Sequence, residues 1–523
     1  MRKQHLLNGG EALARAVERA YEQGGNDYTL EPMHLADSAK QAIGRVRPGD
    51  SVIFCCRRGE REIELTDAFT DPAFEGFDRE RIDPLDFVIL TMYHEKYAKL
   101  PVAFAPSKVS DSLAETIARA GKRQLHLSES EKFAHVTFFF NGGNQAPFAG
   151  EDDVCIPSPK GVAFDTVPAL RLPEVADRLL AGLDEGYDFI VCNFANGDVI
   201  GHTANDEAKL KCAEIVDAEL GRVLARASSA GYTVIITADH GNLERQRTAA
   251  GKPDVAHTDN QVACIAVAEG AASVSEDGRL CDVAPTVLAA MGIEKPAAMQ
   301  GEALFRFQDS ARPVLLLILD GWGIGKQDDT NPIYLAKTPV WDALLASQPV
   351  VYIEASGEHV GLAAGKAGNS EAGHSNLGAG RVVPQDDVRL DNAMRDGSFT
   401  QNPVFVEAMQ NAKAREGALH LIALLTKKSS HGSIDYPLAL LDLAKAEGLQ
   451  KVYMHIIFDG RSTEPGSAPA LLRELGASME QKDIGLIVSG VGRGIALDRD
   501  KNWAKVQRAY ASIAMGEGQY YTE

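Results

Sequence analysis

Two short apolar runs each lead into an aspartate, and this pattern constrains the fold more than any other feature. The run 233–237 is followed after one alanine by Asp239 and His240, and the run 314–319 is followed at once by Asp320. Runs of this length suit buried strands, and open α/β sheets place their ligand sites at the carboxyl ends of such strands. A carboxylate buried there is costly unless it binds a cation or a partner, so both aspartates are candidate metal ligands.

Similar apolar runs alternate with amphipathic stretches along all 523 residues. This alternation is typical of α/β architecture, and the length is typical of two to four domains. The clearest helix covers 207–231 and ends at a glycine. The expected strands cover 51–54, 87–91, 136–140, 188–192, 233–237, 314–319, 421–425, 452–457 and 485–489.

Composition and charge exclude several classes of protein. Hydrophobic residues make up 45% and charged residues 24% of the chain, as in soluble globular proteins. A net charge of −20 argues against a nucleic-acid surface, and no apolar run reaches membrane-spanning length. The seven cysteines have no paired spacing, which favours a reducing compartment. We therefore expect a cytoplasmic protein, monomeric, without nucleic-acid or membrane partners. Any anionic substrate needs a local cluster of cations.

Further metal-type ligands lie in two polar segments. Asp198 and His202 are four residues apart, so one helical turn or tight loop can direct both toward one ion. His257 lies in the polar segment AHTDN. Carboxylates and imidazoles together suit divalent metals that assist phosphoryl transfer. Any one of these residues alone fits a capped turn or a buried histidine, but the set calls for a common reason.

Ser370 is the candidate nucleophile. It lies in the glycine-rich run GKAGNSEAGHSNLGAG, which suits a turn into a helix N-terminus that favours phosphate. A serine hydroxyl needs activation, for which a neighbouring metal is one means. The alternative interpretation makes Ser370 a helix N-cap, with Glu371 in the first turn.

Several long motifs together resemble one family. The segments LILDGWG, GNSEAGHSNLGAGRVV, ITADHGN, SEKFAHVTFFFNGG and FDGRST are similar to motifs of the cofactor-independent phosphoglycerate mutases, members of the alkaline-phosphatase superfamily. Their order is rotated, because the family's opening motif occurs here only at 317–323. The resemblance implies a circularly permuted chain of two α/β domains. Residues 104–386 would form an alkaline-phosphatase-like domain, and 1–103 with 387–523 a smaller transferase domain.

The resemblance also implies a dinuclear metal site and an activity. The metals would be two divalent ions, usually manganese in this family, with zinc, cobalt or magnesium as alternatives. One metal would be held by Asp198, His202 and His257, and the other by Asp239, His240, Asp320 and Ser370. Ser370 would form a phosphoserine intermediate while 3-phosphoglycerate and 2-phosphoglycerate interconvert, an isomerase reaction of glycolysis. The small anionic phosphorylated substrate would contact Lys132, Arg58, Arg61, His431, Arg461, Ser462, Arg493 and Arg499, largely through guanidinium forks.

The motifs expected to contact the substrate differ from the family pattern. The family has an aspartate where this chain has Ser462, and the resemblance implies that this aspartate holds the glycerate hydroxyls and assists proton transfer. The family also lacks the pair Lys427 and Lys428. In one interpretation the pocket accepts a more anionic phosphorylated acid; in another, both lysines point to solvent and Asp435 replaces the lost acid. Two further hypotheses stay open at this point: a metal-dependent phosphohydrolase, in which water attacks the phosphoserine, and a non-catalytic relative that uses the fold for binding.

Overall fold

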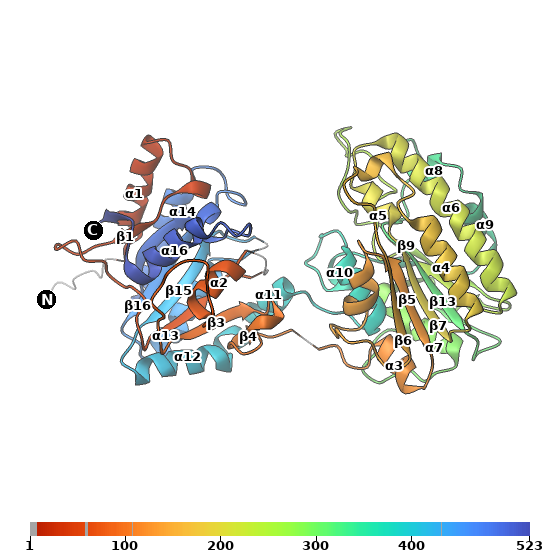
Figure 1. The fold of residues 1–523 in the computed structure, drawn as a ribbon, viewed down its shortest axis with the longest axis horizontal. Coiled ribbons are helices and arrows are strands. Elements are labelled where there is room, and N and C mark those ends of the chain that lie inside the picture. Colours follow the sequence, from red (N-terminus) through yellow and green to blue (C-terminus); the bar gives the residue numbers. More distant parts are fainter. Residues whose placement is uncertain (1–7, 58–60, 107, 430, 523) are drawn as a thin grey trace. The chain divides into compact units, whose positions relative to one another are not determined.

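The chain folds into two compact units, which divide it unevenly. The computed structural model describes residues 8–57, 61–106, 108–429 and 431–522. Unit 1 contains Met1–Pro106 together with Arg389–Glu523, and unit 2 contains Ser107–Val388 (Figure 1). Each unit has its own sheet, so the predicted α/β class with two domains is confirmed. In the part of the chain that the structure describes, no helix combines the length and apolar character needed to span a bilayer.

An eight-stranded sheet forms the centre of unit 2, in the order β11-β14-β9-β8-β13-β7-β5-β6. Neighbouring strands are parallel, except that β9 runs antiparallel to both β8 and β14. In chain order the strands are β5 (Gln124–Glu129), β6 (Glu151–Ile156), β7 (Phe189–Phe194), β8 (Thr233–Thr237), β9 (Val262–Val267), β11 (Asp277–Arg279), β13 (Val314–Leu319) and β14 (Val350–Glu354). The short strands β10 (Ala272–Ser273) and β12 (Phe305–Arg306) form a separate pair.

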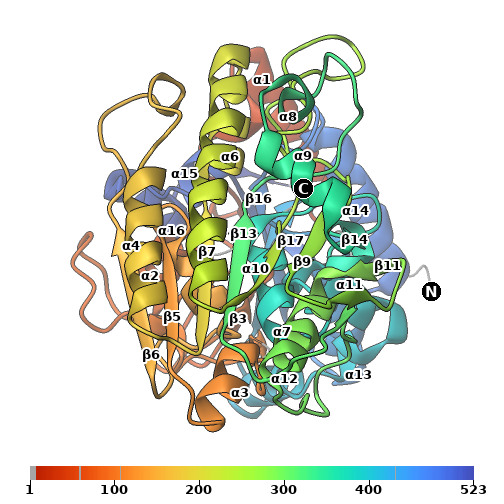
Figure 2. The ribbon, with the colours of Figure 1, turned by 90° about the vertical axis from the view of Figure 1, so that its right-hand side faces the viewer.

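Three parallel strands in the middle of this sheet position the polar residues predicted to bind metal. All residues of β7, β8 and β13 are buried, which explains why their sequences are continuous apolar runs. Helices α4 (Leu172–Asp184) and α6 (Asp206–Ser229) pack side by side over one face (Figure 2). Because β13 pairs with both β7 and β8 in parallel, the carboxyl ends of the three strands meet at one edge.

The remaining helical segments of unit 2 surround the sheet. They are α3 (Leu113–Arg119), η3 (His135–Phe139), η4 (Phe164–Thr166), α5 (Asn196–Gly201), η5 (Leu280–Asp282), α7 (Val283–Met291), α8 (Pro332–Leu335), α9 (Pro339–Ser347), η6 (Gly357–Val360) and α10 (Ser370–Ala379).

Unit 1 contains a second eight-stranded sheet, drawn from both ends of the chain, in the order β18-β1-β17-β16-β15-β2-β3-β4. Only the pair β1 and β17 is antiparallel among these described strands. The strands are β1 (Met33–Leu35), β2 (Ser51–Phe54), β3 (Asp86–Thr91), β4 (Val102–Phe104), β15 (Leu419–Leu425), β16 (Val452–Phe458), β17 (Leu486–Gly492) and β18 (Gln519–Tyr521).

Both faces of the unit 1 sheet are covered. Along β2, Val52 and Phe54 belong to one apolar cluster, whereas Ile53 belongs to the other, as the two-residue period of a strand requires. The helical segments that supply the cover and connections are α1 (Gly10–Glu22), η1 (Asp27–Thr29), α2 (Ile63–Thr70), η2 (Glu95–Tyr97), α11 (Asp386–Asp396), η7 (Ser398–Gln401), α12 (Pro403–Ala414), α13 (Asp435–Ala446), α14 (Ala468–Lys482), α15 (Arg493–Ala496) and α16 (Trp503–Met515).

One predicted strand is wrong. The aromatic and β-branched run at 136–140 favours a strand by composition, but His135–Phe139 is a single turn of π-helix. This turn lies against α10, so closely that a side chain at Gly378 would collide with the Phe140 carbonyl oxygen. Packing against the neighbouring helix therefore overrides the local strand preference.

The central strand of unit 2 predicts a sensitivity to truncation. Leu317 on β13 is fully buried, so Leu317→Ala should lower the free energy of unfolding by about 2–5 kcal/mol through lost burial and a residual cavity. Leu335→Ala on α8, where the side chain is exposed, should change it by less than about 0.5 kcal/mol. Urea denaturation of both variants measures the difference, and equal losses would contradict this account of the core.

Candidate metal centre

Three carboxylates gather at the carboxyl ends of the central strands of unit 2. Asp320 follows β13 directly, Asp239 follows β8 after one residue, and Asp198 lies in α5, just beyond β7. All three residues are buried. Lys132, between β5 and η3, reaches into the cluster: its Nζ donates to Asp198 Oδ2 at 2.6 Å and to Asp320 Oδ1 at 2.8 Å. One ammonium thus faces three carboxylates.

The pKa values of these groups reflect the excess of negative charge. Burial would raise the pKa of Asp198, but Lys132 and the neighbouring histidines hold it well below its usual range. The same opposition, with His240 and His374 as the lowering partners, depresses the pKa of Asp239. Burial and the charge of Asp239 instead raise the pKa of Asp320. The cluster therefore carries more negative charge than Lys132 balances, which favours additional cations.

Three histidines direct one ring nitrogen each toward the carboxylates. Nδ1 of His202 lies 2.8 Å from the Val255 carbonyl oxygen, and Nδ1 of His257 lies 2.8 Å from that of Gly368. His240 Nδ1 is 3.3 Å from the Gly241 carbonyl oxygen. A carbonyl accepts only from a protonated nitrogen, so Nδ1 carries the proton and Nε2 is left to bind a metal.

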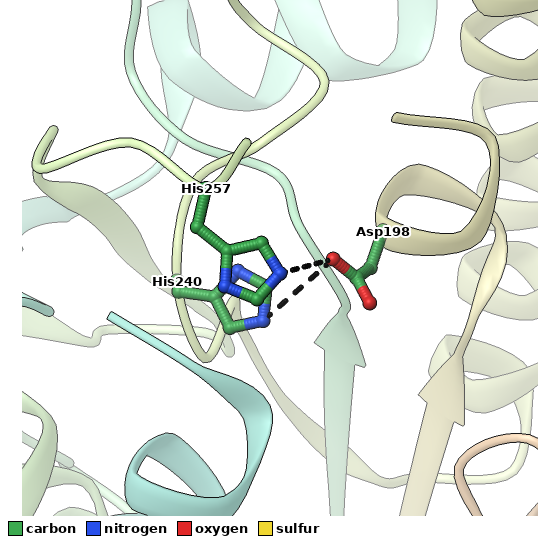
Figure 3. Close-up of side chains that lie close together, drawn as sticks. All are labelled: Asp198, His240 and His257. Carbon is green, nitrogen blue, oxygen red and sulfur yellow. Dashed lines mark ion pairs between the residues drawn. The ribbon is translucent and has the colours of Figure 1, made fainter. Parts of the chain in front are cut away.

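The Nε2 atoms converge on Asp198. His257 Nε2 and His202 Nε2 lie 2.9 Å and 3.2 Å from Asp198 Oδ1, and only 3.0 Å from each other. Figure 3 shows His240 and His257 directed at Asp198, with His240 Nε2 3.9 Å from the same oxygen. His240 Nε2 also lies 3.3 Å from Asp239 Oδ2. Two unprotonated nitrogens facing each other at this distance need a cation or a proton between them. Asp239 Oδ2 is a buried oxygen without a hydrogen bond among the described residues. The donor set therefore fits divalent metal ions.

Ser370 lies at the edge of this donor set. Its Oγ is 2.6 Å from Lys132 Nζ and 2.9 Å from His240 Nε2. It is the first residue of α10, and the N-cap is Asn369, whose side chain accepts from Ala372 N. The N-cap interpretation of Ser370 is thus wrong, because the preceding residue performs that role and leaves the serine hydroxyl to the cluster.

All seven sequence-predicted metal ligands thus meet in one region of unit 2, but their division into two sets stays a prediction. One group of donor atoms within 4.8 Å of one another belongs to Asp198, His240 and His257. A second group, in the same cluster, belongs to Asp239, Asp320 and His374. His240 lies between the two sets rather than wholly within one of them.

Sequence reasoning missed three residues that support the ligands. His374 is buried, lies 3.3 Å from Asp239 Oδ2 through Nδ1, and accepts from Asn193 Nδ2 at its Nε2. Asn193 also donates to Asp320 Oδ2 at 2.7 Å, and Asn242 donates to Asp198 Oδ1 at 2.9 Å. The spacing of His374 one helical turn after Ser370 was the available signal for the first. Nothing local marks the two asparagines.

The residues predicted to contact substrate divide between the units. Lys132 lies in the metal cluster of unit 2, and the others belong to unit 1. There Arg493 is buried and donates to Asp459 Oδ1 at 2.5 Å, and Arg61 is buried and donates to the Leu497 carbonyl at 3.1 Å. His431 is partly buried, Arg461, Ser462 and Arg499 are exposed, and Arg58 lies outside the described residues.

The cluster predicts metal-dependent stability. Asp239→Asn removes one charge from a fully buried ligand, so the rise in melting temperature on adding Mn²⁺ should be lost or reduced by more than half. Asp282→Asn changes a buried acid of the same unit that hydrogen-bonds backbone N–H groups elsewhere, so it should keep the full Mn²⁺-dependent rise. Differential scanning fluorimetry with and without Mn²⁺ measures both, and an undiminished rise in Asp239→Asn would exclude this site.

Comparison with known proteins identifies families and relatives that this chain matches. A family model described as "Metalloenzyme superfamily" matches residues 18–295, and one described as "BPG-independent PGAM N-terminus (iPGM_N)" matches residues 390–523. The 2,3-bisphosphoglycerate-independent phosphoglycerate mutase of Syntrophotalea carbinolica is 45% identical over 298 residues, 56% of this chain and 57% of its own. That of Wolinella succinogenes is 42% identical over 283 residues, 54% of this chain and 56% of its own.

A solved phosphoglycerate mutase from Leishmania mexicana, at low cobalt concentration, covers 52% of this chain and 53% of its own at 27% identity, with a TM-score of 0.41. The chain spans about half the length of the curated relatives it matches. The metal-type donors of unit 2 and the family model that spans more than half of the sequence lead to one conclusion: this chain belongs to the Metalloenzyme superfamily.

Proposed function

We propose that this protein is a metal-dependent phosphoglycerate mutase that interconverts 3-phosphoglycerate and 2-phosphoglycerate through phosphorylated Ser370. The observation that carries the proposal is the position of the Ser370 hydroxyl, which lies 2.6 Å from Lys132 Nζ and 2.9 Å from His240 Nε2, beside the carboxylate cluster. The relatives named 2,3-bisphosphoglycerate-independent phosphoglycerate mutases give the reaction class.

The residues of unit 2 have separate roles in this reaction. Asp198, His202 and His257 would hold one divalent ion, and Asp239, His240 and Asp320 would hold the other with Ser370. Such ions, with manganese as the expected metal, would favour ionisation of the serine hydroxyl and neutralise phosphate charge. The Lys132 ammonium would bind the phosphoryl oxygens, because it already donates to the Ser370 hydroxyl. The glycerate released by phosphoryl transfer would take the phosphoryl group back on its other hydroxyl.

Unit 1 carries the groups proposed to bind the glycerate. Among the described residues, the candidates that are buried or partly buried are Arg61, Arg493 and His431. The candidates at the surface are Arg461 and Arg499. Retention of glycerate separates a mutase from a phosphohydrolase, because both use the same nucleophile and metals. The cytoplasmic location and the monomeric state stay predictions.

We also propose that the chain is circularly permuted, and the order of the two family matches supports this. The family model for the N-terminal part of the mutases matches residues 390–523, which follow the match at 18–295. The unit 1 sheet joins β2, β3 and β4 from one end of the chain to β15, β16 and β17 from the other. A transferase domain divided by permutation would have this composition, and permutation is tolerated where the original termini lie at the surface.

Phosphorus NMR tests the reaction. After incubation of the manganese-loaded protein with 3-phosphoglycerate and quenching with EDTA, a growing 2-phosphoglycerate signal is expected. Ser370→Ala should reduce turnover by at least about 10³-fold, because it removes the nucleophile, while Mn²⁺ binding weakens but persists. Release of inorganic phosphate without 2-phosphoglycerate would indicate a phosphohydrolase rather than a mutase. Undiminished turnover by Ser370→Ala would exclude a phosphoserine intermediate at this residue.

The hypothesis of a substrate more anionic than phosphoglycerate depends on whether two surface lysines contact that substrate. Lys427 pairs with Glu474 at 3.0 Å and Lys428 with Asp391 at 2.5 Å, and their side chains are 71% and 56% exposed. Acidic partners already neutralise both charges, which favours the interpretation that the lysines face solvent. The double substitution Lys427→Met, Lys428→Met should leave KM for 3-phosphoglycerate within about twofold, since exposed pairs contribute about 0–1 kcal/mol. A tenfold rise in KM would instead indicate that the two lysines contact the substrate.

A further inference from the structure

Glu62 is a buried carboxyl group of unit 1 without a hydrogen-bond partner in the part of the chain that the structure describes. It precedes α2, has no accessible surface, and neither Oε1 nor Oε2 has a hydrogen-bond partner among the described residues. Burial raises its pKa, although His431 and Arg493 act in the opposite direction. An unpaired buried carboxylate costs stability, so its presence points to a role other than folding.

The nearest partner of this carboxylate is His431. His431 Nδ1 lies 3.7 Å from Glu62 Oε1, and Nδ1 is itself a buried atom without a hydrogen bond in the described chain. A movement of less than about 1 Å would bring the two atoms to hydrogen-bond distance, and catalytic hydrogen bonds are often long before substrate binds. The other ring nitrogen lies on the opposite edge of the imidazole, and 15% of the His431 side chain is accessible.

The other titratable groups near Glu62 do not compete for this contact. Arg493 donates to Asp459 Oδ1. The Tyr93 hydroxyl shares a hydrogen bond of 2.5 Å with Thr66 Oγ1. Burial raises the pKa of the Cys56 thiol, which stays neutral and is only a weak donor. His431 is therefore the group to which the Glu62 carboxylate can offer a hydrogen-bond acceptor.

The backbone holds the two segments together. Arg57 N donates to the His431 carbonyl at 2.9 Å, and Cys56 forms an isolated β-bridge with Gly432. The Arg57 side chain also donates to the Ser429 carbonyl at 2.7 Å. These contacts hold the loop that carries His431 against Cys56 and Arg57, in the same part of unit 1 as Glu62.

We propose that Glu62 is a positioning residue that holds the Nδ1 proton of His431, so that His431 Nε2 accepts the proton of the glycerate hydroxyl in place of the aspartate that this chain lacks at Ser462. This inference rests on the proposed mutase function.

In the return step, the glycerate O–H bond breaks and its proton moves to His431 Nε2, while the hydroxyl oxygen forms a bond to phosphorus. The bond between phosphorus and Ser370 Oγ breaks, and its electron pair stays on the serine oxygen. The imidazolium that forms lies beside the Glu62 carboxylate, which stabilises it, and it returns its proton when the next glycerate oxygen leaves phosphorus.

Neither of the two nearby replacements for the missing acid fits this role as well. The Ser462 hydroxyl is not a base at neutral pH. Asp435 is exposed and accepts from Ser433 Oγ at 3.1 Å. It lines a surface hollow with Lys427 and Glu474. Of these three residues, Glu62 alone combines complete burial with a free acceptor directed at an imidazole.

Substitution of Glu62 tests the proposal by kinetics. Glu62→Gln keeps the shape but loses the charge, so kcat should fall by about 10²-fold or more while KM changes less than about threefold. Restoring the family's acid in the double variant Glu62→Gln, Ser462→Asp should recover at least tenfold of that loss. The matched control is Glu64→Gln in the first turn of α2, the helix that Glu62 precedes, where the carboxylate accepts from Lys501 N; its kcat should stay within about twofold. Glu62→Gln should also melt no lower than the unsubstituted protein, because it removes an unpaired buried charge.

Imidazole ¹⁵N NMR tests the contact without relying on turnover. The unsubstituted protein should show His431, assigned through His431→Gln, with its proton on Nδ1, and Glu62→Gln should move that proton to Nε2. If the Nδ1–H form is present but no 2-phosphoglycerate is made, the proposed mutase function is contradicted, while the contact between Glu62 and His431 stands. Unchanged kcat in Glu62→Gln, or the same tautomer in both proteins, would overturn the role of Glu62.

Discussion

The ammonium of Lys132, bound by two carboxylates and the Ser370 hydroxyl, is the interaction around which unit 2 is arranged. Like charges collect at this point because three neighbouring parallel strands end together, each followed closely by an aspartate. A single cation does not neutralise all three in a buried site. Burial and the charge of Asp239 raise the pKa of Asp320, whereas Lys132 and the neighbouring histidines lower the pKa values of Asp198 and Asp239. The same imbalance that would destabilise a protein without metal provides affinity for divalent ions.

The residues behind the ligands give the site its precision. Backbone carbonyls of Val255 and Gly368 fix the rings of His202 and His257, so their Nε2 atoms face the same carboxylate oxygen. Asn193 joins Asp320 to His374, and thereby connects the end of β13 to α10, which begins at the proposed nucleophile Ser370. Such outer contacts restrict rotamers before any ion binds, which lowers the entropy lost on binding.

The sequence predicts the strands well because most of them are buried on both faces and read as continuous apolar runs. It also predicts which metal-type side chains come together, because Asp239 and Asp320 follow such runs and Asp198 is one helical turn from His202. It fails at 136–140, where contact with α10 rather than local composition decides the backbone. It also misses Asn193 and Glu62, because their roles depend on partners distant in the chain and neither residue type is diagnostic alone.

The two units differ in how freely their functional residues can change. In unit 2 each ligand contacts several others, so a substitution at one leaves a buried charge or an unpaired ring nitrogen elsewhere. In unit 1 the acid absent at Ser462 lies on an exposed segment, where a substitution disturbs few neighbours. In the proposed mechanism a replacement acid need only act on the same substrate hydroxyl, directly or through an imidazole, and Glu62, 3.7 Å from His431, would act through that imidazole from the opposite end of the chain. Loss of a motif residue in unit 1 therefore does not by itself imply loss of the chemistry that unit 2 supports.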